Sequence, residues 1–413
     1  MQDNNKKFRF IPYRRQDIVE MCLHEGTLGE SEEGFRQLSC MLDHIFHFEF
    51  HRVAEALKNA YAEIDPDADT QPSPVPAAKS DEPFIQLLDG LLEKANYERV
   101  TEADLNQALS ESSLFKIRLH VDFADFSEVS LFTRGQSNRR ETLKTWFGLH
   151  RRMIEFVNFE RIVVYIRMRD DYQSARHEFA GCRPGATLLK LFRNVPKADL
   201  EMLFPNTQVR MRLMDKLLIG VPALVSGGVV LTTKLGASLV LLGSLLGYWL
   251  GLNQQPAELN QAGIMVLLAG AVALGGYLWK QFSNFKNRKL RFMQALTQNL
   301  YFKNLDNNAG VFHRLVNDAN EEESKEAILA YYFLLQSPAA LTRAALDQGI
   351  EGWFASRWNC ELDFEIDDAL HKLLVLGLVE ESESGLSAVS IEQGIGILDR
   401  RWDNYFVPDP GLS

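Results

Sequence analysis

The chain has 413 residues and a net charge of −11 at neutral pH. This length leaves room for two or three soluble modules beside a membrane region, and the negative charge argues against general affinity for nucleic acid. The four cysteines are dispersed, at Cys22, Cys40, Cys182 and Cys360, which predicts reduced thiols and excludes a compact disulfide framework or a close metal-binding pair.

Residues 1–63 are expected to form an N-terminal helical segment, because the apolar residues of Glu33–Tyr61 recur at helical spacing. His44, His47 and His51 follow one another at intervals of three and four residues, so three imidazoles on one helix face could bind a transition metal. The alternative is a partly buried helix whose histidines border its apolar side, which the interleaved phenylalanines favour. We therefore predict no metal and no other cofactor.

Residues 64–83 contain five prolines and many small polar residues, which predicts a linker. Residues 84–205 then combine helix and strand patterns, and we expect a mixed α/β domain with a small antiparallel sheet and helices on one face. The predicted helices are Phe84–Asn96 and Thr101–Ser110. The predicted strands are Phe115–Phe123, Val129–Thr133, Arg161–Arg169 and Thr187–Phe192, of which the first two could pair.

The 63 residues from Leu217 to Trp279 carry only two charges, Lys234 and Glu258. Soluble helices normally show a polar face, so this stretch predicts an integral membrane protein. The membrane region, residues 206–292, contains three apolar segments, at 217–231, 235–252 and 262–279.

Basic residues flank the apolar stretch on both sides, which places both flanks in the cytoplasm by the positive-inside rule. An even number of crossings follows, and we favour a glycine-rich hairpin of the second and third segments over three full crossings. The flanking cations are candidate contacts for the bilayer's lipid headgroups. They are Arg210, Arg212, Lys216, Lys280, Lys286, Arg288, Lys289 and Arg291.

Residues 293–340 are predicted to form a helical connector, and residues 341–406 a winged-helix-like domain. Short helices lead into a strand, a tight turn and a returning strand in this last segment. Between Asn317 and Phe406 there are 18 acidic against 6 basic residues. A phosphate backbone would be repelled, so we expect a protein partner and no nucleic acid.

Leu189–Pro205 (LKLFRNVPKADLEMLFP) precedes the membrane region. Together with Arg9–Pro12 (RFIP), Tyr301–Asn308 (YFKNLDNN) and Asp363–Leu370 (DFEIDDAL), it resembles the transmembrane protein 143 family, also catalogued as domain of unknown function 3754. The signature positions are Lys190, Phe192, Pro196, Asp199, Leu200, Phe204 and Pro205. The resemblance implies soluble domains flanking a short transmembrane unit, a mitochondrial location in animals, and no established reaction.

Two interpretations of the signature remain open. It could be a rigid connector in which a strand changes into a helix near Pro196, or a binding surface that exposes Lys190, Arg193, Lys197 and Asp199 to lipid headgroups or a partner.

The sequence holds no phosphate-binding loop, no zinc-protease motif, no nucleophile elbow and no dinucleotide fingerprint, so no catalytic residue is predicted. The leading hypothesis is an α+β multidomain integral membrane protein that acts as a membrane-anchored adaptor or regulator. Its polar N-terminus lacks an Arg-rich leader, which favours a bacterial inner membrane with cytoplasmic soluble domains. One alternative is a homo-oligomeric channel or transporter built on the hairpin. Another is a membrane-associated hydrolase with Arg134, Asp122, His120 and Arg161 around the sheet.

Overall fold

The structure is a computed structural model that describes residues 7–68, 70–71, 83–101, 103, 105, 118–145, 150–172, 184–210, 236–250 and 261–406. The chain divides into two compact units. Unit 1 comprises Met1–Glu111, Asp122–Asn206 and Lys303–Ser413, and unit 2 comprises Ser112–Val121 and Thr207–Phe302. Unit 1 is thus assembled from three segments that are far apart in the sequence.

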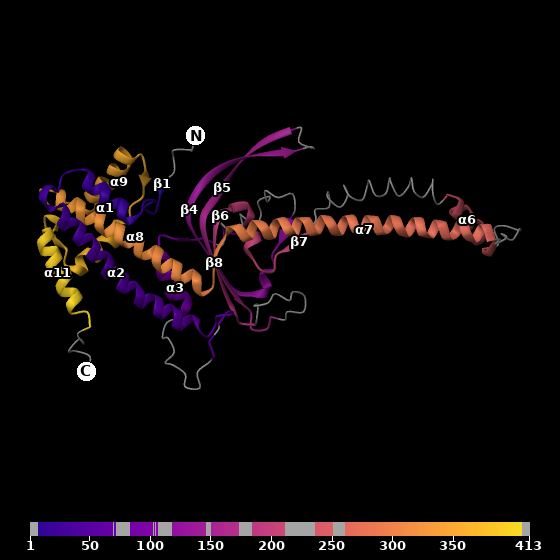
Figure 1. The fold of residues 1–413 in the computed structure, drawn as a ribbon, viewed down its shortest axis with the longest axis horizontal. Helices are drawn as coiled ribbons and strands as arrows, with labels where there is room; N and C mark the ends of the chain where they lie inside the picture. Colours follow the sequence, from indigo (N-terminus) through magenta and orange to yellow (C-terminus); the bar gives the residue numbers. More distant parts are fainter. Residues whose placement is uncertain are drawn as a thin grey trace. The chain divides into compact units, whose positions relative to one another are not determined.

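An antiparallel sheet with the strand order β2-β4-β5-β6-β8 forms one layer of unit 1 (Figure 1). Its strands are β2 (Glu98–Arg99), β4 (Phe126–Thr145), β5 (His150–Met168), β6 (Thr187–Pro196) and β8 (Asn304–Asn307). The β-branched and aromatic run Ile162–Ile166 lies in β5 and is buried on both faces of the sheet. The predicted small antiparallel sheet is confirmed, although β4 and β5 are much longer than the strands expected there.

Helices of unit 1 share a single hydrophobic core with buried side chains on one face of this sheet. They are α1 (Arg15–His24), α2 (Glu32–Tyr61), α3 (Phe84–Lys94), α8 (Ala309–Gln336), α9 (Arg343–Trp358), α10 (Ile366–Leu376) and α11 (Ile391–Asp403). Helix α8 contacts α1, α2, α3, α9 and α10. Residues from the predicted segments 1–63, 84–205 and 341–406 all contribute to this core.

The opposite face of the sheet is covered by the 3-10 helix η3 (Lys197–Leu203), which contacts β5 and β6. Leu200 is buried there, and the Phe204 ring stacks on Phe126 with 6.0 Å between centroids. The strand-to-helix change expected near Pro196 is confirmed, since β6 ends at that proline and η3 begins at the next residue.

In the C-terminal part of unit 1, α8 is followed by an isolated β-bridge, then by two helices and a β-hairpin. Leu341 bridges to Leu386, and α9 and α10 are followed by β10 (Val379–Ser382) and β11 (Gly385–Ala388), which pair antiparallel. Gly377, at φ 74°, ends α10 in the left-handed conformation that glycine favours. In addition, β1 (Lys7–Phe8) pairs with β9 (Glu361–Leu362), so residues 7 and 8 lie on this region.

Unit 2 contains a two-stranded ladder of β3 (Arg118–His120) and β7 (Gln208–Arg210), together with α6 (Gly236–Trp249) and α7 (Gln261–Lys303). The predicted pairing of Phe115–Phe123 with Val129–Thr133 is therefore wrong, because the second segment lies in β4 between β2 and β5. Several predicted segments lie outside the described residues. They are the apolar segment 217–231, the turn at 253–260, most of helix 101–110 and most of linker 64–83.

Candidate functional site

The apolar surface of α7 is the first candidate feature. Among the described residues, Gln261–Asn284 is the one helical stretch long and apolar enough to cross a membrane by length and composition. Only 11% of its apolar window is buried, and Val272 and Trp279 are 75% and 72% exposed. The apolar part of α6, Val240–Trp249, is shorter. An exposed apolar surface of this size indicates association with a membrane.

The predicted headgroup contacts are placed only in part. Lys280 and Lys286 are exposed on α7. Arg288, Lys289 and Arg291 lie in the same helix and Arg210 ends β7, whereas Arg212 and Lys216 lie outside the described residues. Five of the eight cations therefore lie within twelve residues of one helix, directly after Trp279.

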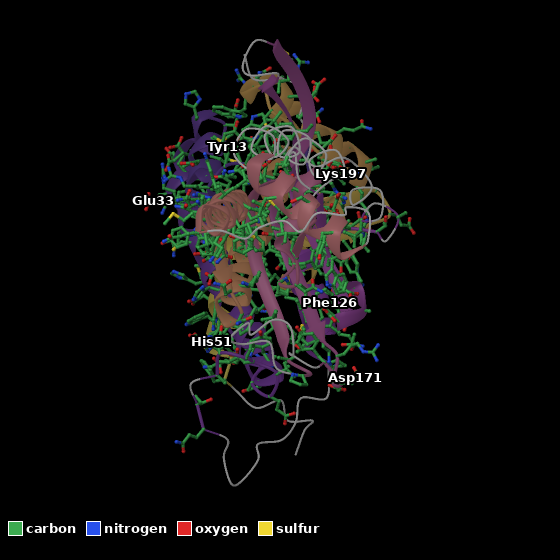
Figure 2. All side chains as sticks on the ribbon, turned by 90° about the vertical axis from the view of Figure 1, so that its right-hand side faces the viewer. Tyr13, Glu33, His51, Phe126, Asp171 and Lys197 are labelled. Carbon is green, nitrogen blue, oxygen red and sulfur yellow. The ribbon has the colours of Figure 1, made fainter. Side chains whose placement is uncertain are left out.

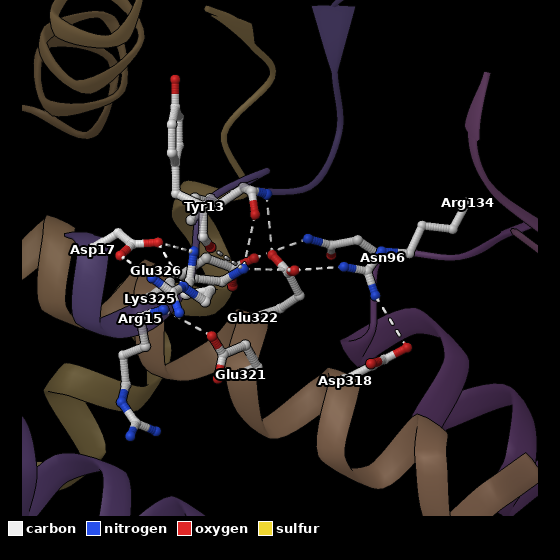
Figure 3. Close-up of polar contacts among 12 residues, drawn as sticks. Tyr13, Arg15, Asp17, Asn96, Arg134, Asp318, Glu321, Glu322, Lys325 and Glu326 are labelled. Carbon is white, nitrogen blue, oxygen red and sulfur yellow. Dashed lines mark hydrogen bonds and ion pairs between the residues drawn. The ribbon is translucent and has the colours of Figure 1, made fainter. Parts of the chain in front are cut away.

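A cluster of buried charged side chains in unit 1 is the second candidate feature (Figure 3). Glu322 and Lys325 of α8 are 1% and 2% exposed. The Nζ of Lys325 donates to the carbonyl oxygens of Ile11 and Tyr13, at 2.8 and 3.1 Å, and to Glu322 Oε1 at 2.8 Å. Glu322 Oε2 in turn accepts from the Ile11 backbone N–H at 3.1 Å. An N-terminal strap, residues 9–15, is thus held on α8 by charged groups.

Arg134 of β4 joins the sheet to the same cluster. Its Nη2 lies 2.6 Å from Glu322 Oε1, and its Nη1 lies 3.5 Å from Asp318 Oδ2. Its guanidinium also lies over the Phe10 ring, 4.6 Å from the centroid. Such pairing offsets the cost of removing these charges from water.

Two further carboxyl groups of α8 face α3 and α10. Glu323 Oε1 lies 2.5 Å from Lys372 Nζ, and Glu326 Oε1 accepts from Asn96 Nδ2 at 3.0 Å. Burial raises the pKa of Glu323, and it raises the pKa of Glu326 to about 8. Glu326 is therefore mostly protonated at neutral pH and could exchange a proton in the physiological range.

A cavity of about 170 Å³ lies beside Asn96. Its lining residues are Arg9, Glu93, Asn96, Tyr97, Glu98, Glu365 and Asp368. Arg9 already pairs with Glu98 and with Glu365, the latter at 2.9 Å. Most of the lining charge is thus used to attach the strap, and the network is explained as a structural fastening.

No motif in the sequence predicts this network. The run Asn320–Glu326 (NEEESKE) falls within the predicted helical connector and contributes to the acidic charge of residues 317–406. One feature of the sequence does indicate it. The charged residues at positions 322, 325 and 326 lie on a helix between apolar residues that end at Ala319 and resume at Ala327. Charges on the apolar stripe of a helix point to buried partners.

The signature residues divide between the sheet and η3. Phe192, Pro196, Leu200 and Phe204 are buried, whereas Lys190 and Pro205 are half-buried. Asp199 is 1% exposed, so its predicted exposure is wrong. Only Arg193 is exposed among the four residues of the proposed binding surface, and Lys197 is half-buried (Figure 2). This placement favours a connector that covers the sheet.

The signature Tyr301–Asn308 also has a structural explanation at its end. Asn308 has φ 48° and precedes α8. Its Oδ1 accepts from Leu189 N and from the Tyr61 hydroxyl, both at 3.1 Å. Asn308 thereby fixes the junction of β8 and α8 to β6 and α2.

The histidines and the residues named for a hydrolase do not assemble into a site. His44, His47 and His51 are exposed on α2, and Figure 2 labels the last of them. No group of three or more metal-ligating side chains exists among the described residues. Arg134 and Arg161 are cross-strand partners in the sheet, and Asp122 caps η2 (Phe123–Asp125) through the Ala124 N–H. His120 belongs to unit 2.

An acidic surface follows α10 and the β10–β11 hairpin. We define it by exposed acids, namely Asp367, Asp368, Glu380, Glu381 and Glu383. Arg343 pairs with two of them, at 3.0 Å from Asp367 Oδ1 and 3.3 Å from Glu381 Oε1. Since Glu322, Glu323 and Glu326 are buried in the network, the acidic excess of this region is carried by the remaining acids.

The model of the family described as "Protein of unknown function (DUF3754)" matches residues 159–310. The match begins in β5 and includes β6, η3, α6, α7 and β8. It agrees with the resemblance to domain of unknown function 3754, does not bear on the transmembrane protein 143 name, and adds no activity. No solved structure matches the chain.

Proposed function

We propose that the chain is a membrane-anchored adaptor or regulatory protein that binds a protein partner through its acidic surface. The observation that carries the proposal is the exposed apolar stretch Gln261–Asn284 of α7. Its 24 residues extend about 36 Å as a helix, enough for a hydrocarbon core of about 30 Å. The resemblance to the transmembrane protein 143 family belongs to this proposal.

The proposed topology has two spans in a bacterial inner membrane, with both flanks in the cytoplasm. The cations that follow Trp279 support it, because cytoplasmic flanks carry the excess of lysine and arginine. Helix α6 would form the other half of the hairpin.

Single-cysteine labelling in intact and opened cells tests the topology, after the native cysteines have been replaced. We expect a probe at Ala257 to be labelled from outside, and probes at Asn5 and Ser413 to be labelled only in opened cells. Labelling of Asn5 and Ser413 from opposite sides would refute the hairpin and would favour a signalling or transport role with an odd number of crossings.

The acidic surface supports a partner with a basic face. Charged groups at the rim of an interface mainly accelerate association. Neutralising them therefore weakens binding of the partner and makes that binding less dependent on salt. We expect Glu380→Gln with Glu383→Gln to weaken in-membrane cross-linking to the partner. Glu30→Gln with Glu33→Gln, which remove the same charge from exposed positions on η1 (Gly29–Ser31) and α2, should leave it unchanged. Equal cross-linking by both double variants would contradict the proposal.

A further inference from the structure

The β4–β5 hairpin extends past the rest of the sheet in unit 1 (Figure 1). Strand β2 pairs with β4 only at Phe132 and Thr133, and β6 pairs with β5 only from Asn158 onward. Eight consecutive pairs, from Asn138↔Val157 to Thr145↔His150, have no third strand in the described ladders. We call Asn138–Thr145 and His150–Val157 the ribbon. It is about 27 Å long at the usual rise of a strand.

The ribbon is basic within an acidic chain. It holds five cations, at positions 139, 140, 144, 151 and 152, against two acids, at positions 141 and 155. The chain as a whole carries −11. A local positive excess at the end of a projecting element attracts anionic partners.

The register gathers cations on one face of the ribbon. Cross-strand partners share a face, and the face of Arg140 is fixed by its 2.9 Å ion pair with Glu155. Lys144 and Arg151 are direct partners, each four positions further along its own strand, so they occupy register positions on this same face. Like charges at directly opposite register positions destabilise a hairpin unless an anion lies against them.

The same face contains an exposed apolar side chain. Met153 is 69% exposed and occupies the register position between Arg151 and Glu155. A two-stranded ribbon has no core of its own and is marginally stable in water. An anionic surface with an apolar layer beneath it would satisfy both the cations and the methionine.

We propose that the face of the ribbon that contains Arg140, Lys144, Arg151 and Met153 docks on an anionic lipid surface. This inference rests on the proposed membrane anchoring, which makes headgroups of the same bilayer available at high effective concentration. Each cation near an anionic surface contributes about a factor of five to binding. Nucleic acid is the less favoured partner because the chain as a whole is acidic.

The test uses the full chain with its native cysteines replaced, Met153→Cys carrying an environment-sensitive fluorophore, and reconstitution into vesicles. Phosphatidylcholine vesicles are compared with vesicles that also contain phosphatidylglycerol. We expect a blue-shifted, brighter label only with phosphatidylglycerol, reversed by high salt. Lys144→Gln with Arg151→Gln should lower the ratio of docked to free ribbon about thirty-fold. Arg52→Gln with Lys58→Gln, which remove the same charge from exposed positions on α2, should not change it.

Carbonate extraction of the same vesicles separates the two hypotheses. If the protein is extracted, the membrane anchoring itself fails. If it stays inserted while the label responds equally in both vesicle types, the docking inference is overturned. If the label instead responds in phosphatidylcholine vesicles and the response rises with the number of protein molecules per vesicle, the ribbon binds a second copy of the chain. A response only to an added DNA duplex would assign it to nucleic acid, and either result overturns the lipid assignment.

Discussion

Replacing Glu326 by glutamine should change how the stability of unit 1 depends on pH. Burial raises the pKa of this carboxyl from 4.5 to about 8, with contributions from nearby Glu322 and Glu323 and an opposing one from Lys372. The folded state therefore keeps a proton that the unfolded state releases near pH 4.5. The stability contributed by this group is complete below the unfolded pKa and is lost as the pH rises toward about 8.

The magnitude follows from the two pKa values. The difference between 4.5 and about 8 corresponds to an upper limit of about 5 kcal/mol. Glutamine cannot ionise, and its amide oxygen can still accept from Asn96. The variant should thus match the wild type near pH 5 and exceed its free energy of unfolding by about 2–4 kcal/mol near pH 8.

Urea unfolding in detergent, followed by tryptophan fluorescence at several pH values, measures this difference. Glu33→Gln is the matched control, because Glu33 is an exposed carboxyl on α2 and should give a pH-independent offset below about 0.5 kcal/mol. A Glu326→Gln offset that stays constant from about pH 5 to about pH 8 would refute the buried, protonated carboxyl.

Three more outcomes can be measured. Lys325→Met removes the donor to two backbone carbonyls and a buried carboxylate. It should lower the free energy of unfolding by about 3–5 kcal/mol. The control variant, Lys58→Met at an exposed position, should change the urea midpoint little. Asn308→Ala places alanine, which cannot form a local hydrogen bond, at φ 48° and removes the acceptor of the Leu189 amide in β6. The free energy of unfolding should fall by about 2–3 kcal/mol, and an unchanged urea midpoint would contradict this expectation. Leu268→Arg with Val272→Arg places two cations in the apolar stretch, and each should make membrane insertion less favourable by about 3 kcal/mol. Carbonate should then release the protein from membranes. Full retention in the membrane would count against the span.

Helices and strands with a strong period could be predicted from the sequence. The expected helices at Glu33–Tyr61 and Phe84–Asn96 correspond to α2 and α3, because their apolar residues repeat on one face. The sequence does not predict the distal part of β4, since Gln136–Thr145 is mostly polar and shows little alternation of polar and apolar residues. Its strand conformation depends on pairing with β5, and such non-local pairing leaves no periodic signal in either segment alone.

The network on α8 shows why charge alone did not locate a buried site. Acids and a lysine three and four positions apart are the usual pattern of a solvated helix surface, and Glu322 and Lys325 fit that pattern. They are buried because the strap, more than 300 positions earlier in the chain, supplies backbone carbonyls and an amide that match them. Only a fold that brings the N-terminus onto α8 provides those partners. Since the same strap pairs Arg9 with Glu365 beside α10, releasing it would disturb the region next to the acidic surface as well as the core.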